Sequence, residues 1–349
     1  MQYTAIRKCL PLLFLLGSIS LWAFPVHAAP KTDTVTFNNG DKLTGEFKSL
    51  KRGRLSLSTD AAGTIGIEWN KISSIVSDQI IQVEISDGTR YFGKLTPSDE
   101  SSNIVVFTGS GRQSLAMTNV INMTPIEGHG IHALDVDLSF GYDFAKAGGV
   151  TNASVGIDMD YRTLVNIESL RFSTQITDSN TLESSKRTNL SFGHTRLWSR
   201  RWFTTGNLSF DQNDELGLDL RSSLGASVGR YRIQSNSMLL AVNAGLQFSR
   251  EDLTTNVEDN DSLEATFAIN WDWFLFDDPE LDLSVSFEVL PSLTQSGRVR
   301  SELDTTLSWE IIGDLKWALS YYGSWDNEPQ SEDGSTSDYG INTSVVYEF

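Results

Sequence analysis

From Leu134 to the C-terminus, apolar and polar residues alternate in segment after segment, and this period of two restricts the fold more than any other feature. In the last strand, Tyr339, Ile341, Thr343, Val345, Tyr347 and Phe349 share one face, while small, polar and acidic residues dominate the other. A period of two belongs to β-strands, since helices repeat every ~3.6 residues. No run reaches the ~18 apolar residues of a membrane helix. Weak alternation over ~10-residue segments is instead typical of a membrane β-barrel.

The alternation predicts a 12-stranded antiparallel transmembrane β-barrel over residues 134–349. The strands are expected near 134–145, 151–162, 167–178, 187–198, 202–211, 220–232, 238–250, 262–275, 281–293, 301–312, 315–325 and 338–349. Tight connections such as Ser199–Arg201 and Ser235–Ser237 alternate with long ones, as such barrels require. An even strand count puts both barrel ends on the periplasmic side. The barrel is expected to close through a C-terminal signal formed by Tyr339, Ile341, Val345, Tyr347 and Phe349.

The two strand faces differ in a way that disfavours the alternative of a soluble β-sandwich. Aromatic residues cluster near strand ends on the apolar side, as in an aromatic girdle: Trp198, Trp202, Tyr231, Trp271, Trp273 and Trp317. Carboxylates crowd the polar side and are expected to line the lumen. These lumen candidates are Asp135, Asp137, Asp143, Asp158, Asp160, Asp272, Asp282, Glu288, Asp304 and Glu310. The fourth strand is the weakest, because His194 and Arg196 share the parity of its apolar residues.

The first 28 residues have the features of an export signal. Arg7 and Lys8 precede an apolar run, and Val26-His27-Ala28 offers small residues for cleavage. Cleavage there would remove Cys9, the one cysteine of the chain, so no disulfide is expected.

Residues 30–127 are expected to form a soluble periplasmic β domain built from two repeats of about 48 residues. Gly40 and Gly45 in the first repeat match Gly88 and Gly93 in the second. Asn39-Gly40 and Asp87-Gly88 have the composition of hairpin turns. Residues 128–133 form the predicted linker to the barrel.

Several stretches of the barrel segment resemble an uncharacterised family of salt-induced outer-membrane proteins. The resemblance lies in turn and strand patterns: Arg201-Trp-Phe203, residues 211–221, Leu224-Gly225, Val228-Gly229, Asp326-Asn-Glu-Pro329 and Ser337-Asp-Tyr339. The N-terminal repeat is similar to a soluble segment found in some members. The resemblance implies a barrel of unknown activity linked to osmotic or salt stress.

Catalytic and metal-binding residues are not expected. His194 is the one histidine in the barrel segment, and Ser191 falls on the opposite strand face from it. His129 and His132 alone, in a glycine-containing linker, are a poor ligand set for a metal. No phosphate loop, zinc pattern or dinucleotide fingerprint appears, so no cofactor is expected.

The acidic net charge of the barrel segment limits which partners the protein can bind. Residues 128–349 carry 15 basic and 34 acidic groups, which excludes nucleic acid as a partner and favours cations. We predict a structural outer-membrane barrel with a role in the envelope or in osmotic adaptation. The alternatives are a cation-preferring porin-like channel, a periplasmic binding module anchored by the barrel, and a lipid-modifying enzyme.

The expected partners follow from this location. They are outer-membrane lipids and lipopolysaccharide, the barrel-assembly machinery through the C-terminal strand, and a periplasmic protein or peptidoglycan. Acidic residues of the outer loops, among them Glu251, Asp252, Glu328 and Asp338, could also bind divalent cations that bridge lipopolysaccharide phosphates.

Overall fold

The computed structural model describes residues 31–98, 102–126, 134–145, 150–179, 184–214, 217–253, 260–276, 279–312, 315–329 and 335–347. The predicted signal peptide, the linker and Phe349 lie outside these ranges. The helical elements within them are 3₁₀ turns of three residues, and none of the described helices is long and apolar enough to cross a membrane.

The N-terminal region forms a nine-stranded β-sheet in the order β4-β3-β2-β1-β5-β6-β7-β8, with β9 pairing β2 and β5. The strands are β1 (Asp33–Phe37), β2 (Lys42–Lys51), β3 (Arg54–Thr59), β4 (Gly63–Glu68), β5 (Ile72–Ile85), β6 (Arg90–Thr96), β7 (Asn103–Thr108), β8 (Gly111–Ala116) and β9 (Val120–Pro125). Apolar side chains from β1 to β9, most of them leucine, isoleucine and valine, form one buried core, in which Phe47 and Leu50 are fully buried. Trp69 Nε1 donates to the Met117 carbonyl at 2.7 Å, joining the 3₁₀ turns η2 (Trp69–Lys71) and η3 (Met117–Asn119).

The two predicted hairpin turns are confirmed. Gly40 and Gly88 have φ values of 90° and 85°, which only glycine adopts readily. The side chains of Asn39 and Asp87 accept hydrogen bonds from the backbone two residues on, at 3.0 and 2.7 Å. Each turn therefore joins an antiparallel pair, β1–β2 and β5–β6.

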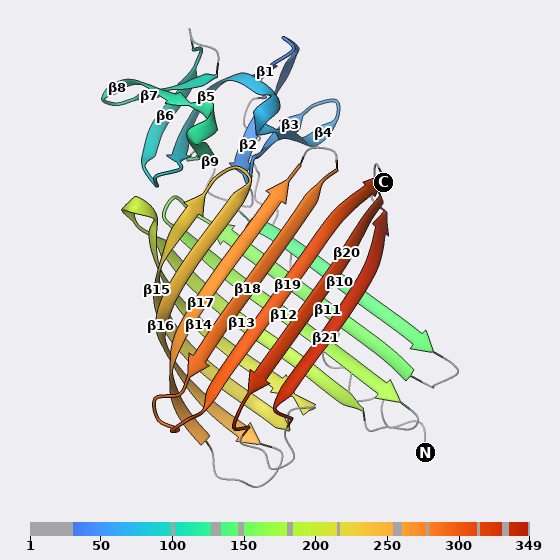
Figure 1. Cartoon of the computed structure of the whole chain (residues 1–349). Coiled ribbons are helices and arrows are strands. Elements are labelled where there is room, and N and C mark those ends of the chain that lie inside the picture. Colours follow the sequence, from blue (N-terminus) through green and yellow to red (C-terminus); the bar gives the residue numbers. More distant parts are fainter. Residues whose placement is uncertain are drawn as a thin grey trace, which may run out of the picture. The chain divides into compact units, whose positions relative to one another are not determined.

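The C-terminal region is a 12-stranded antiparallel sheet in sequence order, β10 to β21, as predicted. Its strands are β10 (Leu134–Ala145), β11 (Val150–Arg162), β12 (Asn166–Ser179), β13 (Ser185–Leu197), β14 (Trp202–Asn213), β15 (Leu218–Gln234), β16 (Met238–Leu253), β17 (Asn260–Leu275), β18 (Leu281–Pro291), β19 (Val299–Ile312), β20 (Leu315–Asp326) and β21 (Ser337–Tyr347). The sheet curls round, so that the orange strands cross the front of Figure 1 and the fainter green strands cross the back. Among the described residues no backbone pairing joins β10 to β21, so the closure of the barrel stays a prediction.

The curl of the sheet defines an inner and an outer face. Arg187 on β13 reaches Asp338 on β21, eight strands away in sheet order, with Nη1 3.5 Å from Oδ2. Residues of this parity therefore point inward. We call the end with the β13–β14 and β15–β16 connections the turn end, and the opposite end, with residues 292–298, the loop end.

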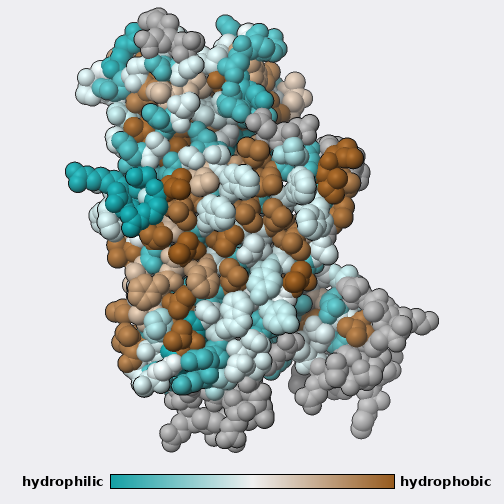
Figure 2. Space-filling model, in the orientation of Figure 1, coloured by the Kyte–Doolittle hydropathy of each residue, from teal (hydrophilic) through white to brown (hydrophobic). Residues whose placement is uncertain are grey.

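The two faces of the sheet have the opposite polarity to that of a soluble protein, because polar residues are buried and apolar residues are exposed. Inward Ser249, Glu264 and Arg298 are 0, 0 and 2% exposed, although all three are polar. Outward Phe140 and Ile341 are 77 and 70% exposed, although both are apolar. Figure 2 shows hydrophobic (brown) atoms spread over the visible outer surface of the strands. The sheet thus has a polar interior and an apolar exterior.

Candidate functional site

A buried ionic network on the inner face is the most highly organised polar site that the structure describes. It begins with the inward column of β19 and the residue before it, where Arg298, Arg300, Glu302 and Asp304 follow one another at every second position. Strand periodicity puts these side chains on one face. Strands β15, β16, β17 and β20 supply their partners.

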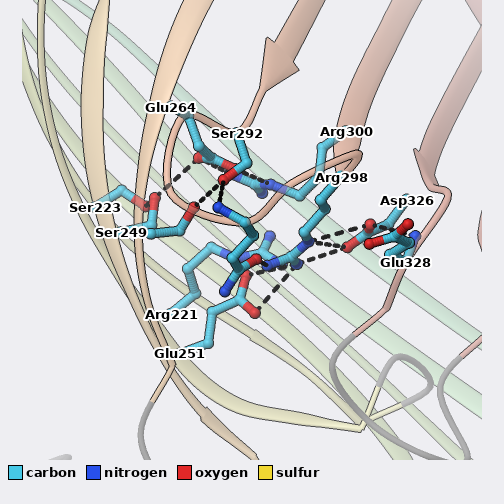
Figure 3. Close-up of polar contacts among 12 residues, drawn as sticks. Arg221, Ser223, Ser249, Glu251, Glu264, Ser292, Arg298, Arg300, Asp326 and Glu328 are labelled. Atoms are coloured by element: carbon cyan, nitrogen blue, oxygen red, sulfur yellow. Dashed lines mark hydrogen bonds and ion pairs between the residues drawn. The ribbon is translucent and has the colours of Figure 1, made fainter.

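Arg300 and Glu264 form the core of the network. Arg300 Nε donates to Glu264 Oε1 at 2.8 Å and Nη2 donates to Oε2 at 2.5 Å, which is the bidentate geometry favoured by a guanidinium and a carboxylate. Ser249 Oγ donates to Glu264 Oε2 at 3.2 Å, and Ser223 Oγ lies 3.1 Å from Ser249 Oγ. Figure 3 shows that the side chains linked by these contacts all point inward: Arg300, Glu264, Ser249 and Ser223.

Arg298 ties the strands of the loop end together. Its Nη2 donates to Asp326 Oδ2 at 2.6 Å and to Glu251 Oε1 at 3.1 Å, and Glu251 Oε1 also accepts from Arg221 Nε at 2.9 Å. Burial disfavours the charged form of Arg298. The hydrogen bonds and charges of Asp326 and Glu251 outweigh that effect, so the pKa of the guanidinium is raised above its ordinary value.

A short loop holds Arg298 in place. Residues 292–298 connect β18 to β19 and fold back on β17, with the Leu293 amide donating to the Leu263 carbonyl at 2.7 Å. The Ser292 amide donates to the Arg298 carbonyl at 2.9 Å, and Gln295 Oε1 accepts from Arg298 Nη1 at 2.8 Å. The loop turns at Gly297, whose φ of 90° suits glycine.

A polar cavity of about 510 Å³ lies beside the network, between opposite walls of the curled sheet. Arg187, Asp211 and Arg221 line one wall, and Glu302, Asp304 and Tyr322 line the other. The Arg187 guanidinium lies 4.6 Å from the centre of the Tyr322 ring, and Asn213 Nδ2 donates to Asp338 Oδ2 at 3.4 Å. These contacts hold the two walls together across the interior.

The side chains of the network are held rigidly. Side chains that are buried, paired and multiply hydrogen-bonded are fixed in position. Among the described residues no group of three or more His, Cys, Asp or Glu side chains is placed to hold a metal ion.

Seven of the ten predicted lumen carboxylates have described side chains, and these seven are spread along the inner face. Asp158 and Asp160 share Arg171, at 3.5 and 3.7 Å. Asp135 and Asp137 lie opposite these two in the register, and their side chains, like that of Asp143, lie outside the described set. The other five are placed as follows: Asp272 accepts from Ser284 Oγ at 2.8 Å, Glu310 accepts from the Glu280 amide at 2.9 Å, Glu288 lies opposite Glu302, Asp282 lies opposite Ser308, and Asp304 lines the cavity.

Three expectations from the sequence need correction. Glu251 was expected in an outer acidic loop, but the structure buries it inside the network on β16. Asp338, expected in another outer acidic loop together with Glu328, pairs inward with Arg187. Tyr231, expected in the girdle, packs inward on Phe203 with ring centroids 4.9 Å apart, because its register places it opposite the buried Ala241.

The predicted parity of the fourth strand is found in the structure, together with a partner that the sequence analysis missed. His194 and Arg196 face outward on β13, and Glu168 on the neighbouring strand lies directly opposite His194. The His194 Nδ1 atom is 2.8 Å from Glu168 Oε1.

The carboxylates of the network, Glu251, Glu264 and Asp326, were all absent from the predicted set. Parity alone could have identified Glu264, since it lies between the outward Leu263 and Ala265. No sequence signal marks Arg298, because it lies in a connection whose path depends on the fold.

The residues of the network and of the adjacent cavity lie within a segment that matches a known family. The chain belongs to the family described as protein of unknown function DUF481, which matches residues 138–349. A comparison with curated proteins gave no match.

Proposed function

We propose that this DUF481 chain is an outer-membrane β-barrel protein whose interior is closed at the loop end by the Arg298–Arg300 network. The observation that carries the proposal is the reversed polarity of the 12-stranded sheet. A soluble sheet of this size would bury its apolar face, since monomeric soluble proteins rarely expose apolar patches larger than a few hundred Å². A barrel in lipid has the opposite requirement.

Strand length supports a membrane-spanning role. The strands of the sheet are 11 to 17 residues long. A tilted transmembrane strand needs ~9–11 residues, so each strand is long enough to cross the hydrocarbon layer.

Exposed tryptophans at the turn end fit an interfacial girdle. Trp198, Trp202, Trp273 and Trp309 are all exposed on the outer face within a few residues of their strand ends. Tryptophan concentrates at the boundary between lipid and water. The turn end would therefore lie at one membrane boundary. Its short connections favour the periplasmic side, which puts residues 31–126 in the periplasm.

The network supports a closed interior rather than an open pore. Its guanidinium and carboxylate groups span β15 to β20, and Arg298 is fully buried among them. An open aqueous channel would leave such groups in contact with water. We infer a structural role in the envelope. The resemblance to salt-induced outer-membrane proteins suggests that this role is part of osmotic adaptation.

A cation-preferring channel is the second candidate. The cavity beside the network carries three carboxylates, Asp211, Glu302 and Asp304, against the two guanidiniums of Arg187 and Arg221. Carboxylate-lined interiors favour cations. This candidate requires the network to open.

Two experiments test the proposal. The mature protein should fractionate with the outer membrane and show heat-modifiable mobility on electrophoresis, as a folded barrel does. Recovery in the periplasmic extract without detergent would refute the membrane location. In planar bilayers the folded protein should carry no steady current. A stable conductance in a KCl gradient would refute the closed barrel and support the channel.

A further inference from the structure

An apolar groove crosses the outer face of β10 to β15, in the half of the sheet that is nearer to the turn end. Its volume is about 510 Å³, and Met159, Leu170, Phe192 and Leu208 contribute to its walls. Ligand sites fall in the range of ~300–1,000 Å³. The groove is therefore large enough for part of an elongated apolar ligand.

Gly206 creates the space in the groove. It faces outward on β14, between His194 on β13 and Ala226 on β15. A Cβ atom at this position would meet nothing within 4 Å. The absence of a side chain thus leaves an unfilled channel between the larger side chains around it.

The polar end of the groove is formed by His194 and Glu168. Two residues further along β13 lies Arg196, about 7 Å away at the ~3.3 Å rise of a strand. Its guanidinium carbon is 4.8 Å from the centre of the Trp198 ring. The groove therefore leads from apolar walls to a cation held against an aromatic ring.

A second cation lies on the same side. Arg230 is opposite Trp202 in the register, with its guanidinium carbon 5.6 Å from the ring centre. Its Nε atom is buried and has no hydrogen-bond partner among the described residues. Neither Arg196 nor Arg230 has an ion-pair partner within that described part of the chain.

This corner of the sheet differs in charge from the rest of it. Five of the 15 basic residues of residues 128–349 lie here: Arg196, Arg200, Arg201, Arg230 and Arg232. The segment as a whole is strongly acidic, so this local excess of arginine favours an anionic partner. Arg196 and Arg230 are the two that lie on the outer face beside a tryptophan. Guanidinium groups match phosphate oxygens in geometry and charge.

We propose that the outer face of β11 to β15 binds one phospholipid with an anionic headgroup. One acyl chain lies in the groove beside Gly206, and the headgroup phosphate is held by Arg196 and Arg230 beside their tryptophans. The inference rests on the proposed membrane location, which supplies the lipid and puts the turn end at a phospholipid surface.

Native mass spectrometry of the mature protein in detergent micelles, with phosphatidylglycerol added, tests the site. Gly206→Leu fills the groove, and Ala244→Leu creates the same side chain at an exposed outward position outside it. We expect Gly206→Leu to reduce the one-lipid complex by about tenfold, as losing ~1–2 kcal/mol of apolar contact would do, and Ala244→Leu to leave it unchanged.

The headgroup is tested separately. The double variant Arg196→Gln/Arg230→Gln should also reduce the complex by about tenfold. The double variant Arg200→Gln/Arg232→Gln removes the same charge from the same corner and should not. An equal loss in both pairs would indicate a diffuse basic surface and overturn the site.

Heat-modifiable mobility is recorded in the same samples, so that only folded variants are compared. If Gly206→Leu does not fold, the arginine pairs carry the test. A folded wild-type protein whose lipid binding ignores both the groove and the arginines would refute this inference and leave the barrel intact. A wild-type protein that stays dissolved without detergent would refute the barrel itself.

Discussion

Neutralising one member of the buried ion pair at the core of the network tests the idea of a closed interior most directly. Glu264→Gln keeps the size of the side chain and removes its charge. The Arg300 and Glu264 side chains are only 5 and 1% exposed. The guanidinium would then stay buried without its bidentate partner, and only the charges of Glu302 and Glu251 would remain near it.

The expected cost follows from this burial. Breaking a buried pair by removing one partner costs about 3–5 kcal/mol. For a domain of this size ~1 kcal/mol shifts Tm by about 2–4 °C. We therefore expect a fall of about 6–20 °C, measured by circular dichroism in micelles at fixed protein and detergent concentration.

Two comparisons isolate the effect. Arg300→Met alone should be as costly, whereas Glu264→Gln/Arg300→Met should recover most of the loss, since no unpaired charge remains. Asp158→Asn removes a carboxylate from an ion pair whose side chains are both 55% exposed, and it should cost less than about 1 kcal/mol.

A small effect of Glu264→Gln would refute the reasoning. If the variant loses less than about 1 kcal/mol, Arg300 is hydrated when its partner is gone. The interior at the loop end would then hold a continuous column of water, and the claim of obstruction would fail.

Three further predictions concern the outer face, the network and the N-terminal region. Phe267→Arg should reduce membrane folding by about 2–4 kcal/mol, whereas Ala268→Arg, on the inner face, should fold; equal yields in a vesicle-folding assay would contradict the assigned faces. Arg298→Ala should produce a current in planar bilayers, and a silent variant would show that the network is not the barrier. Trp69→Phe leaves the Met117 carbonyl without its donor and should destabilise the isolated N-terminal region by ~1–3 kcal/mol in urea unfolding; an unchanged midpoint would show that this bond is dispensable.

The strands of the large sheet could be predicted because each one carries its own signal. Alternation repeats within a strand, so its limits and faces need no knowledge of its neighbours. Even the weak fourth strand follows this rule, with His194 outward as its parity requires. Predicted and observed strand ends agree within about three residues.

The network could not be predicted in the same way, because its contacts join residues far apart in the chain. Parity shows that Arg300 and Glu264 face inward, but only the curl and register of the sheet bring them into contact. Glu251 illustrates the limit: its acidic neighbours favour a solvated loop, and its burial depends on Arg298, 47 residues away. Charge composition therefore predicts a lumen lined by acids and cannot identify which of them are neutralised.

In the proposed barrel, the closure of the interior and its charge selectivity would depend on the same arginines. Arg221, Arg298 and Arg300 neutralise Glu251, Glu264 and Asp326 at the loop end, while Glu302 and Asp304 face the adjacent cavity. Removing Arg298 would both loosen the barrier and leave the interior more negative. Any current gained by Arg298→Ala should accordingly favour K⁺ over Cl⁻ in a KCl gradient, since carboxylates raise the local concentration of cations. A reversal potential that favours Cl⁻ would mean that the current bypasses this interior, and the link between the network and the conduction path would be lost.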